Sequence, residues 1–261
     1  MEYKIFDIHT HIFPDNIAKK AVTNLGEYYG VPMFSEGTLT ELEKWSAAEP
    51  RIKKCLIHST ATRPSQVRSV NDYVASVINS KYLGFGTVHP DYDDIEGEIN
   101  RILEIGLRGI KLHPDFQGFN IDSEKAFRIF EIAEGKLPVL THAGDENVDN
   151  SSPARIRNVI DNFPHLTLIA AHLGGYQNWD DAERLLVGKN LYFDTSSVLQ
   201  VINHAQAVRI IKEHGTHKCL FGTDFPMHEP ARVVEMFLSL GFSEEDNHRI
   251  FWENGAKLFD I

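Results

Sequence analysis

One repeated pattern constrains the fold of this chain more than any other feature: a short apolar run, a polar turn and a segment of helical periodicity. After a longer first interval, the runs recur about every 25 to 30 residues. Short apolar runs that alternate with helices are typical of a parallel sheet, and eight such units predict a closed (β/α)8 barrel, the TIM barrel. The first run ends in Asp7–His11, and the others are Cys55–His58, Leu83–His89, Gly109–His113, Leu137–His142, Leu166–His172, Leu191–Asp194 and Cys219–Asp224.

The interval between the first two runs is the longest in the chain. It contains amphipathic stretches around Ile17–Tyr29 and Thr40–Trp45, so we expect an elaborated first βα loop, Pro14–Glu49, that covers the site. An extra helix is expected over Glu244–Phe259. No linker, charge block or low-complexity segment interrupts residues 1–261, so we predict one barrel domain of the usual length, about 250 residues. Helical periodicity between the runs covers, for example, Val67–Ile78, Ile95–Ile105 and Ala126–Ala133.

Charge and cysteine content limit the partners and the compartment. The formal net charge is −11, which argues against nucleic acid or an anionic membrane surface as the main partner. The two cysteines, Cys55 and Cys219, each lie inside an apolar run, so we expect buried, reduced thiols and a cytoplasmic protein. No apolar stretch is long enough to cross a bilayer, and we expect no leader before the first run. A small-molecule substrate is expected, and a homo-oligomer is left open.

Residues that can bind a metal or carry a proton close almost every run. Because side chains alternate along a strand, we expect His9 and His11 to share one side, with Phe6, Ile8 and Ile12 on the other. In barrels of this type the C-terminal ends of the strands converge on one mouth, where active sites lie. The other strand-end groups are His58, His89, His113, His142, His172 and Asp224.

Four of these residues match the needs of a catalytic metal site, which takes a few nitrogen and carboxylate ligands and keeps one position open for water. His9, His11, His142 and Asp224 would supply three imidazoles and one carboxylate from the first, fifth and eighth strands. The first and eighth strands are neighbours in a closed barrel, so ligands far apart in sequence can meet. An ion held there would lower the pKa of bound water to about 7, and Asp224 could take the water's proton.

Five short motifs in this order resemble the amidohydrolase superfamily. Within it they are most similar to the second large branch, which includes aminocarboxymuconate-semialdehyde decarboxylase and related metal-dependent hydrolases. The resemblance runs from the first strand to the last helix, and it is specific for the superfamily rather than for a substrate. The motifs are Asp7-Ile8-His9-Thr10-His11 followed by Pro14, Gly109-Ile110-Lys111-Leu112-His113-Pro114, Thr141-His142-Ala143-Gly144, Ala171-His172-Leu173-Gly174-Gly175 and Gly222-Thr223-Asp224-Phe225-Pro226, with Asn254-Gly255-Ala256-Lys257-Leu258-Phe259 as the ending.

The resemblance implies that His9, His11, His142 and Asp224 hold one divalent ion, most often zinc, with manganese or a second ion as alternatives. It also implies that His172 is the catalytic histidine beside the bound water or substrate. In the hydrolases of the superfamily, metal-activated water attacks a carbonyl or imine carbon and the eighth-strand aspartate moves the proton. In the decarboxylases of this branch, the metal holds the substrate.

Lys111 and His113 share one face of the fourth strand, so one of the pair is expected at the mouth. In binuclear members of the superfamily a lysine here becomes a carbamate that bridges two metals, whereas an unmodified lysine could contact a substrate carboxylate. We favour a mononuclear site with Lys111 and His113 lining the pocket. Arg63, in the loop after the second strand, is a further candidate to bind an acidic substrate. His58 and His89 are expected to be hydrogen-bonded structural residues.

The expected activity is hydrolysis of a C–N or C–O bond of a small substrate by metal-activated water. A non-oxidative decarboxylase of a small unsaturated or aromatic carboxylate is the alternative, and the short chain favours hydrolysis only weakly. A metal-dependent deoxyribonuclease of the same superfamily would carry a glutamate ligand in the fourth strand, where this chain has Gly109–His113. A barrel without activity, used as a binding module, is disfavoured by the complete ligand set.

Overall fold

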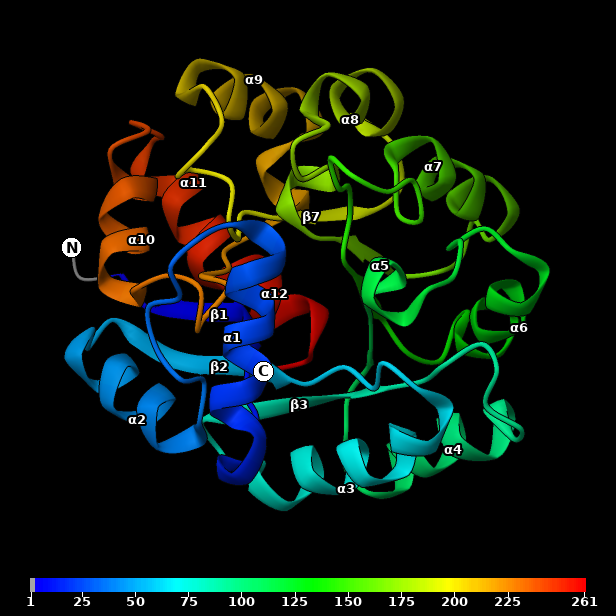
Figure 1. Cartoon of the computed structure of the whole chain (residues 1–261). Helices are drawn as coiled ribbons and strands as arrows, with labels where there is room; N and C mark the ends of the chain where they lie inside the picture. Colours follow the sequence, from blue (N-terminus) through cyan, green and yellow to red (C-terminus); the bar gives the residue numbers. More distant parts are fainter. Residues whose placement is uncertain (1–2) are drawn as a thin grey trace.

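The structure is a computed structural model that describes residues 3–261, and its centre is a parallel barrel (Figure 1). Eight strands are hydrogen-bonded in sequence order, which confirms the predicted (β/α)8 architecture. The strands from β4 onward are shorter than the apolar runs that predict them. The strands are β1 (Ile5–His11), β2 (Ile52–His58), β3 (Tyr82–Thr87), β4 (Ile110–Leu112), β5 (Val139–Thr141), β6 (Leu168–Ala170), β7 (Tyr192–Asp194) and β8 (Cys219–Leu220).

Hydrogen bonds between β1 and the segment after β8 close the barrel. The amide of Ile8 donates to the carbonyl of Phe221 at 2.9 Å, and the amide of Asp224 donates to the carbonyl of His9 at 2.9 Å. These bonds place residues from opposite ends of the chain side by side. The backbone pairing therefore brings the side chains of the first and eighth strands together, as predicted.

A ring of helices surrounds the barrel, and α1 crosses in front of it in Figure 1. Both expected helices of the long first interval are present, and the Thr38 side chain caps the second by accepting from Glu41 N at 3.2 Å. The helical segment expected after the eighth strand is also present. The helices are α1 (Asp15–Tyr29), α2 (Leu39–Ala48), α3 (Val67–Val77), α4 (Ile95–Glu104), α5 (Pro114–Gln117), α6 (Glu124–Ala133), α7 (Pro153–Asn162), α8 (Trp179–Leu186), α9 (His204–His214), α10 (Pro230–Leu238), α11 (Glu244–His248) and α12 (Asn254–Leu258), with 3-10 turns η1 (Pro64–Gln66), η2 (His172–Gly174) and η3 (Thr216–Lys218) and a π-helical turn η4 (Arg249–Glu253).

The pairing of β1 with β2 changes register in the middle of the strand. Asp7 lies opposite Cys55, whereas Thr10 lies opposite Ile57, so three steps along β1 match two steps along β2. An extra residue of this kind interrupts the regular alternation of side chains. The side chains before and after the shift therefore need not follow one alternating pattern.

The expectation that Phe6 and Ile8 face away from His9 and His11 is wrong, because both belong to a buried apolar cluster inside the barrel. Leu56 and Leu140 of the same cluster lie two residues before His58 and His142, so the cluster forms the layer beneath the strand ends. The register shift explains how one strand supplies both layers. The buried members of the cluster are Phe6, Ile8, Leu56, Phe85, Leu140, Ile169, Ala171, Leu220 and Phe259.

Aromatic rings pack tightly in this floor of the barrel. Phe259, from the end of the chain, lies with its ring centroid 5.7 Å from that of Phe6 and 5.7 Å from that of Phe85. Gly109 at the entrance to β4 leaves room for the Phe85 ring, because a Cβ there would lie 2.3 Å from it. Replacing one of these phenylalanines with alanine typically costs about 3–5 kcal/mol of stability.

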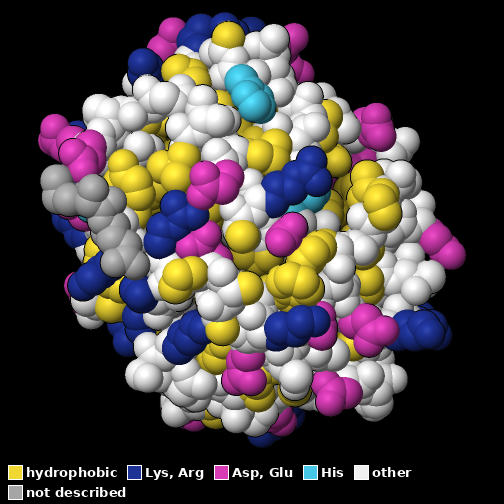
Figure 2. All heavy atoms as spheres, turned by 90° about the vertical axis from the view of Figure 1, so that its left-hand side faces the viewer, with side chains coloured by type: hydrophobic (Ala, Val, Ile, Leu, Met, Phe, Trp, Pro, Cys, Tyr) yellow, Lys and Arg dark blue, Asp and Glu magenta, His cyan; other side chains and the backbone are white. Residues whose placement is uncertain are grey.

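A larger apolar core lies between the strands and the surrounding helices, and it includes Ile12, which does face away from the mouth as expected. Cys55 and Cys219 are buried free thiols, as predicted, and burial raises the pKa of both. Among the helices of residues 3–261, none combines the length and the apolar character that crossing a membrane requires. On the face shown in Figure 2, basic and acidic side chains are interspersed.

Candidate metal centre

Three predicted ligands converge where β1 ends and the chain leaves β8. The Nε2 atoms of His9 and His11 are 3.2 Å apart, and the Asp224 Oδ1 atom lies 3.2 Å from His11 Nε2 and 3.4 Å from His9 Nε2. Ligands about 2.1 Å from a common ion are separated by about 3.0 Å in octahedral and 3.4 Å in tetrahedral geometry. The triangle of donor atoms therefore has the size that a divalent ion requires.

A carboxylate at the end of β7 sets the tautomer of His9. Asp194 Oδ2 lies 2.8 Å from His9 Nδ1, so this nitrogen must carry the proton and His9 Nε2 keeps its lone pair. The other carboxylate oxygen of Asp194 accepts from the His172 and Ser196 amides, both at 3.0 Å. A carboxylate partner of this type is the usual support of a metal-binding histidine.

Asp194 is not among the residues that the sequence predicts for the site, where it is only the end of an apolar run. Its strand-end position is the one signal in the sequence that points to it, because the other seven runs also end in residues that can bind a metal or carry a proton. The residue is completely buried. Its contacts with His9 and His172 join two of the predicted site residues to β7.

His142 and His172 face each other with their unprotonated nitrogens. His142 Nε2 lies 2.7 Å from the Gly144 carbonyl, and His172 Nδ1 lies 2.8 Å from the Ser196 carbonyl. A carbonyl only accepts, so these two nitrogens carry the protons. The remaining atoms, His142 Nδ1 and His172 Nε2, are 3.0 Å apart, and two lone pairs at that distance call for a proton or a cation.

The protonation states of the cluster suit metal binding, which needs neutral imidazoles and ionised carboxylates. Burial and the neighbouring Lys111 lower the pKa of His9 to about 4, and burial likewise lowers the pKa of His11 and His142. Burial opposes the ionisation of Asp224, but His9 and a hydrogen bond with His11 keep its pKa well below the usual range. Ser197 Oγ also donates to Asp224 Oδ2 at 2.5 Å.

Backbone strain coincides with two of the predicted site residues. His172 and Asp224 have φ values of 59° and 60°, in the left-handed region that residues other than glycine rarely adopt. Trp179 Nε1 donates to the His172 carbonyl at 2.9 Å, so this indole supports the strained turn. Strain of this kind gathers where a side chain must be aimed at a site.

The structure separates the roles of Lys111 and His113. Lys111 is completely buried, its Nζ lies 3.1 Å from His9 Nε2, and burial lowers its pKa to about 8. His113 reaches the cavity instead, where its ring stacks on that of His142 with centroids 4.0 Å apart. Because Lys111 points at the nitrogen that an ion would use, its ammonium proton competes with metal at His9.

A cavity of about 690 Å3 opens onto this cluster, and α1 contributes much of its wall. His11, His142, His172 and Asp224 line its inner end. Its aromatic wall consists of Phe13, Tyr29, Tyr73, Phe116 and Tyr176. Among the described residues that line it, Lys20 is the one lysine or arginine.

The structure does not bring Arg63 to this cavity. The neighbouring Thr62 and Gln66 line it, whereas Arg63 is exposed at the start of η1, where its amide donates to Gln66 Oε1 at 3.1 Å. His228 approaches the site through Ser197 Oγ, 3.0 Å from its Nε2. His89 is a hydrogen-bonded structural residue, as expected, with Nε2 3.1 Å from the Gln117 carbonyl.

Three groups of side chains in the described part of the chain could each hold a metal ion, with their ligating atoms within 4.8 Å of one another. Two of the groups share His9, and the third contains His142. The predicted ligands His9, His11 and Asp224 are thus brought together, while His142 joins them through His172. The groups are His9, His11 and His58; His9, His172 and Asp224; and His113, Asp115 and His142.

Comparison with known proteins identifies relatives of this fold. A family described as Amidohydrolase matches residues 6–261. No curated protein sequence matches the chain at a significant level. A solved structure of 2,6-dihydroxybenzoate decarboxylase complexed with 2,6-dihydroxybenzoate is similar at 16% sequence identity with a TM-score of 0.77, over 99% of this chain and 100% of that chain.

Two further solved structures are similar over nearly their whole length. One is a dihydroxybenzoic acid decarboxylase from Polaromonas sp. JS666 with bound manganese and the inhibitor 2-nitroresorcinol, at 14% identity and a TM-score of 0.76, over 99% of this chain and 97% of that chain. The other is named as a candidate 2-pyrone-4,6-dicarboxylic acid hydrolase, from Pseudomonas putida, at 16% identity and a TM-score of 0.67, over 100% of this chain and 98% of that chain. At these identities the likeness establishes the fold.

Proposed function

This chain belongs to the amidohydrolase family, and from that premise we propose that it is a metal-dependent, non-oxidative decarboxylase of a small aromatic carboxylate. The observation that carries the proposal is a cluster of imidazole and carboxylate groups, with lone pairs turned inward, at the end of an aromatic-walled cavity. The similar structures named as dihydroxybenzoate decarboxylases support the same reaction class. The hydrolase expected from sequence becomes the second candidate.

The cavity supports an aromatic carboxylate as the substrate. Phe13, Phe116 and Tyr176 offer flat apolar surface to a ring, and such contacts prefer offset or edge-to-face packing. The substrate's carboxylate needs a countercharge, yet the wall offers only Lys20, which is solvent-exposed on α1. The histidine and aspartate cluster at the inner end is therefore the place where a cation would meet the carboxylate.

A divalent ion would be held by His9, His11 and Asp224, with His142 Nδ1 as the fourth donor. When bound, it would supply the positive charge that orients an anionic substrate and stabilises charge developing on its oxygens. Asp194 keeps the proton of His9 on Nδ1. The Ser197 hydroxyl donates to Asp224 Oδ2 and so leaves Oδ1 to face the ion.

His172 is the acid–base residue in this proposal. Decarboxylation breaks the bond between the ring carbon and the carboxyl carbon, releases carbon dioxide and adds one proton to the ring carbon. The His172 imidazole is anchored through Nδ1 to the Ser196 carbonyl, which leaves the Nε2 lone pair at the cavity, where it would take up a proton from solvent and pass it to the ring carbon. No oxidant or reductant is needed, because the electron pair of the broken bond forms the new C–H bond.

Hydrolysis remains the second candidate because the same groups suit it. Asp224 would then take a proton from water and pass it to the leaving group, with His172 Nε2 beside the water as a hydrogen-bond acceptor. The similarity to the candidate 2-pyrone-4,6-dicarboxylic acid hydrolase favours this reading. The two reactions differ in mass balance, since only hydrolysis consumes water.

A labelling experiment tests the proposal. The protein, loaded with Mn²⁺ or Zn²⁺, is incubated in D2O with a panel of carboxyl-labelled hydroxybenzoates and, separately, in ¹⁸O water with small lactones and amides. We expect labelled carbon dioxide and one deuterium at the vacated ring carbon, both lost in His172→Asn and after chelation. Incorporation of ¹⁸O without release of carbon dioxide would establish the hydrolase instead.

A further inference from the structure

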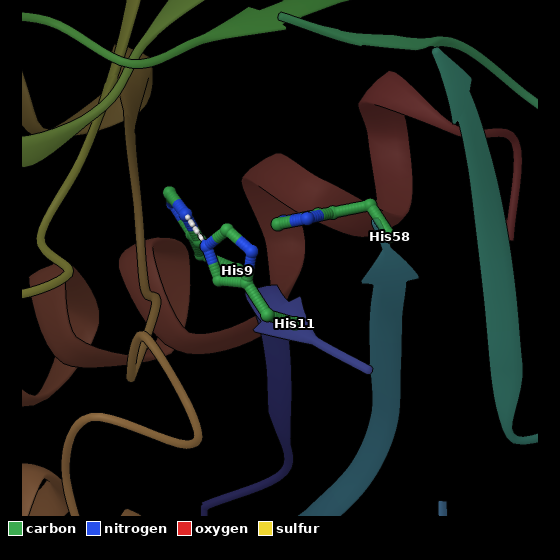
Figure 3. A group of neighbouring side chains, drawn as sticks. All are labelled: His9, His11 and His58. Carbon is green, nitrogen blue, oxygen red and sulfur yellow. Dashed lines mark hydrogen bonds between the residues drawn. The ribbon is translucent and has the colours of Figure 1, made fainter. Parts of the chain in front are cut away.

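One buried histidine beside the metal centre has no partner. His58, the last residue of β2, is completely buried, and neither of its ring nitrogens makes a hydrogen bond. The expectation that it is a hydrogen-bonded structural residue is therefore wrong. Its ring centroid lies 4.4 Å from that of His11 and 4.9 Å from that of His9. Figure 3 shows the His58 ring reaching from the end of β2 toward the other two.

An unpartnered imidazole in this position needs an explanation. A neutral imidazole has one N–H donor and one lone pair, and leaving both unpaired inside a protein is costly. The usual explanation for such a group is a functional role or an unseen small partner.

A substrate in the cavity is not this partner. The residues that follow His58, Ser59 and Thr60, line the cavity, but His58 itself does not. The ring instead faces the histidine cluster, where its ligating atom lies within 4.8 Å of those of His9 and His11. Whatever satisfies its lone pair must be small and must lie among these imidazoles.

We propose that His58 is a further ligand of the metal centre, bound to the same ion as His9 and His11. This inference rests on the proposed metal-dependent function. One ion is sufficient, because Asp194 occupies His9 Nδ1 and leaves Nε2 as the only His9 nitrogen for metal. The two groups of possible ligands that share His9 therefore belong to one site, with His58 on its β2 side. These groups are His9, His11 and His58, and His9, His172 and Asp224.

Metal affinity measured without any substrate tests this inference. His58→Leu removes both nitrogens at similar volume, and His89→Leu is the matched control, because His89 is also buried near a strand end but bonds to the Gln117 carbonyl. Dissociation constants for Mn²⁺ and for Zn²⁺ are obtained by competition with a chelator. We expect affinity to fall by about tenfold or more in His58→Leu and to change by less than about threefold in His89→Leu.

Thermal unfolding of the metal-free proteins separates this role from a structural one. The metal-free His58→Leu protein should unfold at the wild-type temperature or above it, since the change removes unpaired polar atoms, whereas His89→Leu should unfold at a lower temperature. Unchanged affinity in His58→Leu would overturn the inference alone, because the wild type would still bind the ion. Absence of binding in the wild type would overturn the proposed function as well.

A second measurement needs no variant. Anomalous diffraction from wild-type crystals soaked in Mn²⁺ or Zn²⁺ locates the ion directly. We expect a His58 ring nitrogen within about 2.3 Å of the ion, the range of metal–imidazole bonds. An ion bound by His9 and His11, with only an ordered water on His58, would refute the ligand role.

Discussion

Exchanging Asp194 for asparagine should weaken metal binding by reversing the tautomer of His9. The Asp194 Oδ1 atom accepts from the His172 amide, the Ser196 amide and the Ser196 hydroxyl, at 3.0, 3.0 and 2.5 Å. In Asp194→Asn these three donors hold the amide oxygen in the same place. The amide nitrogen must then face His9 Nδ1 and donate to it, which moves the imidazole proton to the nitrogen that an ion would use.

The size of the effect follows from the contact that is lost. Removing the outer partner of a metal-binding histidine typically costs 10- to 100-fold in metal affinity, or about 1.4 to 2.7 kcal/mol. A hydrogen bond to a charged acceptor, such as the 2.8 Å bond from His9 Nδ1 to Asp194, is worth about 1.5 to 3 kcal/mol. The two ranges overlap, so we expect Mn²⁺ and Zn²⁺ to bind about 10- to 100-fold more weakly.

Chelator competition measures the affinity, and Ser196→Ala provides the control. This variant removes one donor to Asp194 Oδ1 and a hydroxyl 3.0 Å from His9 Nδ1, but it leaves the carboxylate that accepts from His9. Its affinity should change by less than about threefold, since the His9 tautomer is preserved. Equal affinities of Asp194→Asn and the wild type, in proteins that unfold at similar temperatures, would show that Asp194 does not control the His9 lone pair.

Three further predictions concern the metal count, proton transfer and pH. His9→Ala should lose one equivalent of bound metal as measured by elemental analysis; two equivalents in the wild type would instead indicate a carbamate at Lys111. Asp224→Asn should reduce turnover by at least about 100-fold even where metal is retained; normal turnover at full metal loading would remove Asp224 from the mechanism. His214 is buried, donates from Nε2 to the Leu191 carbonyl at 3.0 Å, and burial lowers its pKa to about 4. Its unfolded form binds a proton near pH 6.5, so the free energy of unfolding should fall as the pH drops from 7 to 5, by about 2 kcal/mol from this residue. In urea titrations His214→Gln should lose about that much less over the same interval, and identical losses would contradict the assignment.

Sequence periodicity was sufficient to predict the barrel because every βα unit contributes the same short-range pattern. The convergence of the candidate ligands His9, His11 and Asp224 followed from one rule, that strand ends meet at the mouth. The pairing of β1 with the segment after β8 then brings these residues into contact. Local pattern and long-range topology agree at these positions, which is why the sequence alone predicted that these three side chains would meet.

Other parts of the site depend on contacts that leave no local trace. Asp194 matters because it meets His9 across 185 positions of sequence, and no motif links the two. In the sequence, His58 and His89 are equivalent strand-end histidines. Only the structure shows that the ring nitrogens of His58 lack hydrogen-bond partners, whereas His89 bonds to the Gln117 carbonyl. Lys111 likewise lies deeper in the barrel than the cavity. The alternation of side chains along a strand predicts which side a residue faces but not how deep it lies.

The register shift in β1 has a consequence for how this segment can vary. Between Asp7 and Thr10, β1 has one residue more than the paired segment of β2. This extra residue lets Phe6 and Ile8 point into the floor of the barrel, while His9 and His11 point inward at the mouth. Exchanging one aliphatic residue for another there would leave the geometry intact. Losing or gaining a single residue would rotate one layer out of the barrel, so the geometry of this segment depends more on its spacing than on which aliphatic side chains it carries.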